Sequence, residues 1–189
     1  MPRRIVLVKH GQPVLDASKP AREWLLAKEG EAQSKRLASA LRAFIPFRLV
    51  TSPERKALRT CEIVASELGV PMTVAKDLRE FDRPALPIMP PAEHERLNAQ
   101  IFADLGQRVI GAESGREALD RFAAAVLGEL QRTKSGNLVA ITHGTVISLL
   151  VGGHNEMDAF ALWKRLRCPS YVVLDAPSLA LVEVVEEVA

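Results

Sequence analysis

The chain has little cysteine, few aromatic side chains and no long apolar run. Two of its 189 residues are cysteine, and 5% are Phe, Trp or Tyr. Cys61 and Cys168 lie far apart and form no Cys-x-x-Cys pair, which argues against a disulfide framework and a zinc knuckle. No apolar run approaches the about 18 residues that a membrane helix needs. We therefore expect a cytoplasmic protein in a reducing compartment, without a membrane segment.

An excess of charge of one sign is also missing. The chain carries 25 Lys and Arg against 23 Asp and Glu, a formal net charge of +2. Nucleic-acid binders typically combine a basic stripe with interleaved aromatic rings, and this sequence has neither, so nucleic acid is not an expected partner. The length and the 48% hydrophobic content suit a single domain over residues 1–189.

Strand and helix patterns alternate along the chain, which favours an α/β fold with helices covering a central sheet. Buried strands are predicted at 5–8 and 138–141, further strands at 47–50 and 72–74, and a closing hairpin or pair of strands at 171–174 and 179–184. Helices are predicted at 28–44, after Ser52-Pro53, after Ser114 and around 146–151.

Three local signals refine these elements. Ser52 is a plausible N-cap with Pro53 in the first helical position, and Ser114 with Glu117 has the spacing of a capping box. The segment near 82–92 contains several of the twelve prolines. Because proline fits neither a helix interior nor an inner strand, we expect an irregular excursion there, either a rigid loop or a lid over a site.

Two of the four histidines occupy the same kind of position: a buried strand, then His10 or His143, then glycine. Ligands of α/β sheets bind beyond the carboxyl ends of the strands, so both rings are expected at one site. Lys9 and Lys56 add positive charge, and the helix after Ser52 adds free N–H groups. This combination predicts a phosphate site rather than a metal site.

These motifs resemble those of the histidine phosphatase superfamily, which includes the phosphoglycerate mutases, and they occur in the family's order. The second motif of that family is similar to 51–61. Its other motifs are similar to Leu7-Val8-Lys9-His10-Gly11-Gln12, Leu78-Arg79-Glu80, Gly111-Ala112-Glu113-Ser114 and Ile141-Thr142-His143-Gly144.

The resemblance implies a three-layer α/β/α sandwich with a mostly parallel central sheet, as in phosphoglycerate mutases. It also implies a mechanism without a cofactor, in which His10 attacks phosphorus and forms a phosphohistidine. His143, Lys9 and Lys56 would bind the phosphate oxygens. Glu80 would protonate the leaving oxygen, with Asp82 as the nearby substitute.

The chain departs from the family in both phosphate-binding arginines, which are Lys9 and Lys56 here. Lysine keeps the charge but lacks the planar fork of arginine donors. Three functions follow as alternatives. The chain is expected to remove phosphate from a small phosphorylated metabolite or a phosphoprotein. It would otherwise bind phosphate or a phosphorylated ligand with little or no turnover, or transfer phosphate as a phosphoglycerate mutase does. The sequence contains no signal for oligomeric state.

Overall fold

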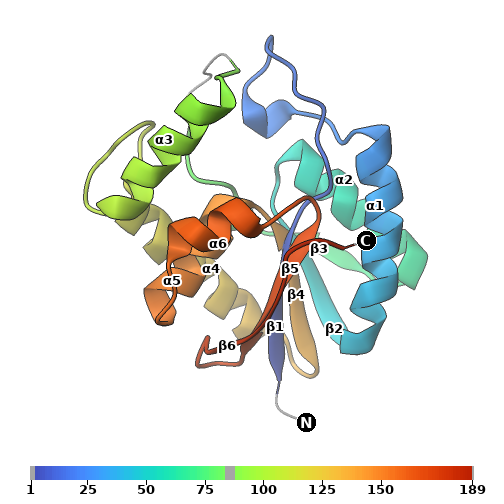
Figure 1. The fold of residues 1–189 in the computed structure, drawn as a ribbon. Helices are drawn as coiled ribbons and strands as arrows, with labels where there is room; N and C mark the ends of the chain where they lie inside the picture. The colour runs from blue at the N-terminus through green and yellow to red at the C-terminus, as the bar shows by residue number, and fades with distance from the viewer. Residues whose placement is uncertain (1–2, 84–87, 189) are drawn as a thin grey trace.

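A six-stranded sheet forms the centre of the molecule (Figure 1). The structure, a computed structural model, describes residues 3–83 and 88–188. The strand order is β3-β2-β4-β1-β5-β6. The strands are β1 Arg4–Lys9, β2 Phe47–Thr51, β3 Met72–Val74, β4 Asn137–Thr142, β5 Ser170–Asp175 and β6 Leu181–Val185.

The sheet is parallel from β3 to β1 and antiparallel from β1 to β6. The predicted closing pair of strands is therefore present as β5 and β6. In the parallel part, Lys9 pairs with Thr142 and Thr51 pairs with Ile141. Strands β1, β2 and β4 consequently end at the same edge of the sheet, and the segments that follow them meet there.

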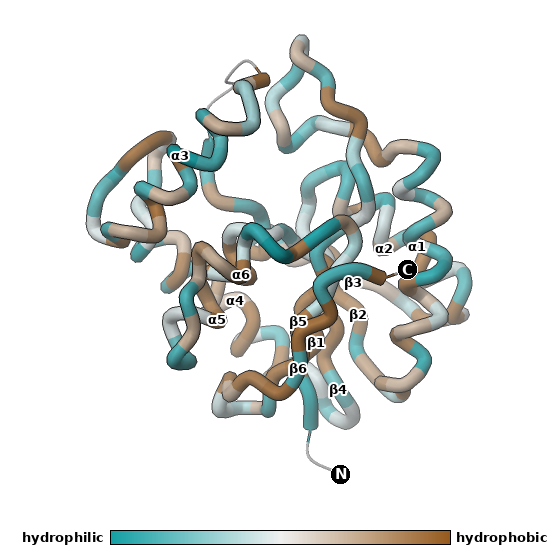
Figure 2. The backbone as a smooth tube through the Cα atoms, viewed as in Figure 1, coloured by the Kyte–Doolittle hydropathy of each residue, from teal (hydrophilic) through white to brown (hydrophobic). Residues whose placement is uncertain are grey.

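Helices cover both faces of this sheet, as predicted, and make three layers (Figure 1). Ile5 and Leu7 of β1 pack in one apolar cluster with α4 and α5, while Val6 and Val8 pack in a second cluster with α1 and α2. Figure 2 shows the apolar residues concentrated along the central strands. The helices are α1 Lys28–Leu41, α2 Arg55–Leu68, α3 Pro91–Ala103, α4 Gly115–Arg132, α5 Gly144–His154 and α6 Ala159–Arg165.

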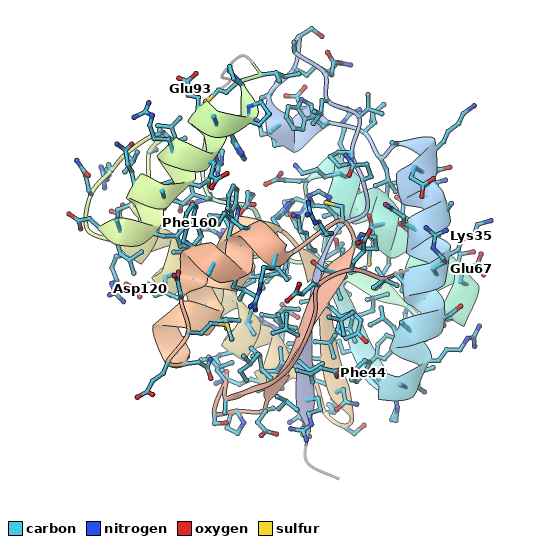
Figure 3. The ribbon with its side chains drawn as sticks, in the orientation of Figure 1. Lys35, Phe44, Glu67, Glu93, Asp120 and Phe160 are labelled. Carbon is cyan, nitrogen blue, oxygen red and sulfur yellow. The ribbon has the colours of Figure 1, made fainter. Side chains whose placement is uncertain are left out.

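The outer faces of the helices are polar. Lys35 on α1 and Glu67 on α2 are exposed and project away from the sheet (Figure 3). This is the amphipathic arrangement that the spacing of apolar residues in 28–44 predicted. Within the described ranges, none of the helices combines the length and the apolar character that crossing a bilayer requires.

The structure corrects one predicted helix start and confirms another. Helix α2 begins at Arg55 with Glu54 as its N-cap, so the assignment of Ser52 as N-cap and Pro53 as the first helical residue is wrong. The physical reason is that the Ser52 hydroxyl accepts the N–H of Glu54 and contacts a histidine instead. The capping box of Ser114 and Glu117 is present at the start of α4.

The predicted irregular excursion near 82–92 is only partly described. Residues 84–87 lie outside the described residues, and 88–90 form no regular element. From Pro91 onward the chain is helical, with proline at the first turn of α3, so the excursion is shorter than predicted. Proline fits that position because the first N–H groups of a helix have no partner within it.

Candidate active site

His10 lies immediately after β1, at the edge where the parallel strands end. Its backbone N–H donates to the carbonyl of Thr142, at 3.1 Å, and its side chain is buried. Nδ1 lies 2.7 Å from the carbonyl oxygen of Gly11. Because a carbonyl oxygen only accepts hydrogen bonds, Nδ1 carries the hydrogen, and Nε2 of the neutral ring keeps a free lone pair. That lone pair is available to attack an electrophile.

His143 lies at the end of β4 and is the N-cap residue of α5. The centroids of its ring and the His10 ring are 5.2 Å apart, in an edge-to-face arrangement. Its Nε2 lies 2.7 Å from the Ser52 hydroxyl. In the described part of the chain, no partner for its buried Nδ1 is present. A buried polar atom without a partner is rare in folded proteins, and here it leaves hydrogen-bonding capacity for a ligand.

Both rings are electrically neutral near pH 7. Burial, followed by the positive charge of Lys56, lowers the pKa of His10 well below its usual value. Burial and the charges of Lys56, Arg121 and Lys9 do the same to the pKa of His143. Both effects disfavour a protonated ring. A neutral His10 keeps its Nε2 lone pair for nucleophilic attack.

The two lysines that were predicted to bind phosphate both lie at this site. Lys56 is almost fully buried, and its Nζ donates to the carbonyl of Ala21 at 2.7 Å and to the Glu54 carboxylate at 2.6 Å. Lys9 donates to the carbonyl of Leu166 at 2.7 Å. An ammonium group has three donors, so Lys56 keeps one for a ligand. The protein therefore fixes the position of each ammonium group.

Glu80 also lies at the site, against the start of α5. Its carboxylate accepts the N–H groups of Phe81 at 2.8 Å and of Thr145 and Val146 at 3.2 Å. The Asp82 carboxylate accepts the N–H of Ala112 at 2.9 Å and so faces another turn. The geometry thus brings Glu80, and not Asp82, to the first turn after His143.

Glu113 anchors the segment that carries Glu80. Its carboxylate binds the guanidinium groups of Arg79 and Arg121 at 2.7–3.1 Å and accepts the N–H of Asp82 at 2.7 Å. Burial raises the pKa of Glu113, but the hydrogen bonds from Arg121 and Arg79 together outweigh burial and lower it below its usual value. The ionised carboxylate and its two arginines fix residues 79–82 in place.

Two residues of the site were missed by sequence reasoning. Glu54 contacts Lys56, accepts the N–H of Glu80 at 2.8 Å, and lies 3.6 Å from Nε2 of His143. Arg83 donates to Asn98 at 2.6 Å and to the Thr145 hydroxyl at 3.3 Å. The spacing Glu-x-Lys after Ser52-Pro53 is a signal that could have pointed to Glu54; no comparable signal marks Arg83.

Comparison with known proteins places this geometry in a family. Residues 5–175 match the model of the histidine phosphatase superfamily, branch 1. A curated relative, "Probable phosphoglycerate mutase GpmB" of Salmonella paratyphi A, is 26% identical over 172 residues, which cover 87% of this chain and 80% of the relative.

Solved structures show the same fold. Mycobacterial glucosyl-3-phosphoglycerate phosphatase superposes with a TM-score of 0.78 at 20% identity, covering 99% of this chain and 100% of that one. A mutant of phosphoserine phosphatase from Entamoeba histolytica, in complex with phosphoserine, superposes with a TM-score of 0.74 at 16% identity, covering 96% of each chain. Because the family model spans most of the sequence, this chain belongs to the histidine phosphatase superfamily, branch 1.

Proposed function

We propose that the protein hydrolyses phosphate monoesters of small metabolites through a phosphohistidine on His10. The observation that carries the proposal is the tautomer of His10: its Nδ1 donates to Gly11, so the Nε2 lone pair is free in a buried, cationic site. A phosphoprotein remains a second substrate class for the same chemistry.

In the proposed reaction, Nε2 of His10 bonds to phosphorus while the bond from phosphorus to the leaving oxygen breaks. Lys9, Lys56 and the unpartnered Nδ1 of His143 bind the non-bridging oxygens and stabilise the charge that spreads over them. Glu80 is the proposed donor of a proton to the leaving oxygen, for which it must give up a backbone hydrogen bond. Water then attacks phosphorus while the bond from phosphorus to Nε2 of His10 breaks, and the proton that water loses returns to Glu80, so that inorganic phosphate is released.

One observation favours a second candidate, a phosphate-binding protein with little turnover. Both lysines already donate to protein acceptors, and neither offers the two parallel donors of an arginine. Losing a good charge-assisted contact in the transition state reduces a rate by about a hundredfold. Such a protein would bind phosphate at the same site but would form no phosphoenzyme. The name of the curated relative keeps phosphate transfer between positions of phosphoglycerate as a third possibility.

The test is hydrolysis of an aryl phosphate between pH 5 and 8, with chelator present, by the wild type and by His10→Ala. We expect turnover in the wild type, none in His10→Ala, and a phosphorylated protein mass in rapidly quenched wild type. Full activity of His10→Ala contradicts the nucleophile assignment. Phosphate binding without turnover or phosphoenzyme in the wild type supports the second candidate.

A panel of physiological esters then separates hydrolysis from transfer. Phosphoserine and glucosyl-3-phosphoglycerate, the compounds named for the structural neighbours, are compared with 3-phosphoglycerate. Release of inorganic phosphate indicates a phosphatase. Conversion of 3-phosphoglycerate to its 2-isomer without net release indicates a mutase.

A further inference from the structure

Glu54 is a carboxylate in the phosphate pocket that the proposed reaction does not use. Its side chain is 10% exposed, and Oε2 lies 2.6 Å from Nζ of Lys56. Its Oε1 accepts the N–H of Glu80 and lies 3.6 Å from Nε2 of His143. Lys56 is one of the residues proposed to bind phosphate oxygens, and its third donor is free for a ligand. A phosphoryl group on that donor therefore lies near the Glu54 carboxylate.

A carboxylate beside a bound phosphoryl group discriminates between the ionisation states of that phosphoryl group. It accepts hydrogen bonds and donates none, so it repels an oxygen that carries no hydrogen and binds a P–OH group. The two Glu54 oxygens together offer about four acceptor positions, and Lys56 and the Glu80 N–H occupy two of them. Acceptor capacity thus remains for a hydroxyl of the ligand.

We propose that Glu54 selects the monoanionic, singly protonated phosphoryl group by accepting a hydrogen bond from its P–OH. The inference rests on the phosphate site of the proposed function and adds the ionisation state that the site takes. Phosphate monoesters lose their second proton at a pKa of about 6, so both states are available to a protein near neutral pH. The dianion leaves the Glu54 carboxylate facing an unprotonated oxygen, which is unfavourable in a buried site.

The groups around Glu54 come from three segments. Lys56 follows it on α2, His143 faces it from the start of α5, and Glu80 approaches from the 79–83 segment. Arg83 of that segment lies within electrostatic reach of both carboxylates. The pKa of His143 is lowered well below its usual value by burial and by Lys56, so this ring stays neutral while the ligand titrates. The ligand's own proton is then the main variable between pH 5.5 and 7.5.

Inorganic phosphate and sulfate test the proposal directly. They have the same tetrahedral shape, but sulfate carries no proton across this range, whereas both ions of inorganic phosphate, H2PO4⁻ and HPO4²⁻, keep a P–OH group. Calorimetry measures the binding of each anion at pH 5.5, 6.5 and 7.5 to the wild type, Glu54→Gln and Glu62→Gln. Glu62 is an exposed carboxylate of α2 that pairs with Arg59, and it serves as the matched control.

We expect the wild type to bind phosphate at least tenfold tighter than sulfate at pH 5.5, a difference of about 1.4 kcal/mol, and to keep a preference for phosphate up to pH 7.5, because a P–OH group remains on the ion. Glu54→Gln should bind sulfate more tightly and reduce the preference to about threefold or less, since the amide replaces a negative charge. Glu62→Gln should match the wild type. Equal binding of both anions by the wild type, or an unchanged preference in Glu54→Gln, overturns the proposal.

A folding control and an independent readout complete the test. If thermal unfolding shows that Glu54→Gln is not folded, Glu54→Asp, which keeps the carboxylate, and the pH series of the wild type decide the question. Glu54→Asp should keep the preference for phosphate, and its loss counts against the proposal. Anion binding requires no turnover. Failure of the His10 mechanism appears in hydrolysis, whereas failure of this inference appears in the phosphate-to-sulfate ratio.

Discussion

At the scale of single residues, one hydrogen bond determines what His10 can do. The Gly11 carbonyl holds the hydrogen on Nδ1, and burial beside Lys56 keeps the ring neutral. His143 is neutral for the same two reasons. Two buried neutral histidines also affect stability, because the unfolded chain binds protons that the folded chain does not.

Stability should therefore fall as the pH drops below the pKa of unfolded histidine, about 6.5. The pKa values of His10 and His143 are lowered in the folded chain, so below pH 6.5 the unfolded chain takes up protons that the folded chain does not. The stability that the two neutral rings contribute is therefore present above pH 6.5 and is lost as the pH falls. Between pH 7.5 and 5.5, linkage predicts a loss of up to about 1.4 kcal/mol of unfolding free energy for each histidine. Urea unfolding at both pH values measures it.

The matched variants are His143→Gln and His154→Gln. Between pH 7.5 and 5.5, His143→Gln should lose less free energy of unfolding than the wild type, and the difference should equal the contribution of one histidine. His154 is exposed at the end of α5, so His154→Gln should keep the slope of the wild type. An equal slope in all three proteins would show that His143 does not bind a proton on unfolding in this range.

The sequence predicted the residues that carry a family motif but missed those that reach the site through side-chain direction. His10, His143, Lys9, Lys56 and Glu80 all lie at one edge of the sheet. Their assigned roles stay predictions. Glu54 has no assigned role in any such motif. Its side chain reaches Lys56 because α2 begins at Arg55, and the start of a helix is the least certain part of a pattern.

At the scale of elements, close approach between α1 and the segment after β1 fixes the position of His10. A Cβ on Gly30 of α1 would lie 2.3 Å from the carbonyl oxygen of Gln12, and one on Gly11 would lie 2.7 Å from the carbonyl oxygen of Gly30. Both contacts involve backbone, which cannot rotate away. Helix α1 therefore packs directly against the residues that follow His10.

Gly30→Ala should for this reason displace Gln12 and Gly11, the residue that orients His10. We expect a destabilisation of about 1–3 kcal/mol, typical of overpacking, together with lower turnover of aryl phosphate. Gly128→Ala in α4 is the control. Its nearest contact is the flexible tip of Arg132 at 3.4 Å, and alanine favours a helix by roughly 0.5–1 kcal/mol. Urea unfolding and hydrolysis distinguish the two variants, and an active, stable Gly30→Ala would contradict the packing argument.

Elements with strong periodicity or a clear cap were predicted correctly, including β4 and the capping box of α4. The start of α2 was predicted wrongly because Ser52, a good N-cap by type, is used by His143 and by the Glu54 N–H. The start of α3 at Pro91 was missed because proline was read only as a helix breaker. In the first case a local propensity was overridden by the hydrogen bonds that the fold gives Ser52; in the second, the preference of proline for the first turn of a helix was overlooked.

At the scale of the whole molecule, the site is assembled from segments that are distant in sequence. The ends of β1, β2 and β4 supply His10, Ser52 and His143, and the carbonyl of Leu166 positions Lys9. A ligand bound at this edge contacts several elements at once. It should therefore stabilise the fold as a unit.

Inorganic phosphate should raise the melting temperature of the wild type. At a concentration about 100-fold above its Kd, the added stability is about 2.7 kcal/mol, which for a chain of this size is roughly 5–10 °C. Lys56→Met, which removes a proposed phosphate contact, should show a much smaller shift. Differential scanning calorimetry in chloride of equal ionic strength provides the baseline. The absence of any shift in the wild type would contradict a phosphate site.

The separation of β1 and β4 along the chain has a consequence for synthesis. These strands are neighbours in the sheet, yet His143 follows His10 by 133 positions. At a translation rate of about 5–20 residues per second, the second histidine emerges roughly 7–27 s after the first. During that interval the growing chain contains His10 without its partner ring, and β1 without its parallel neighbour. Because β4 lies between β2 and β1, the proposed phosphate site cannot form before residue 143 has been synthesised.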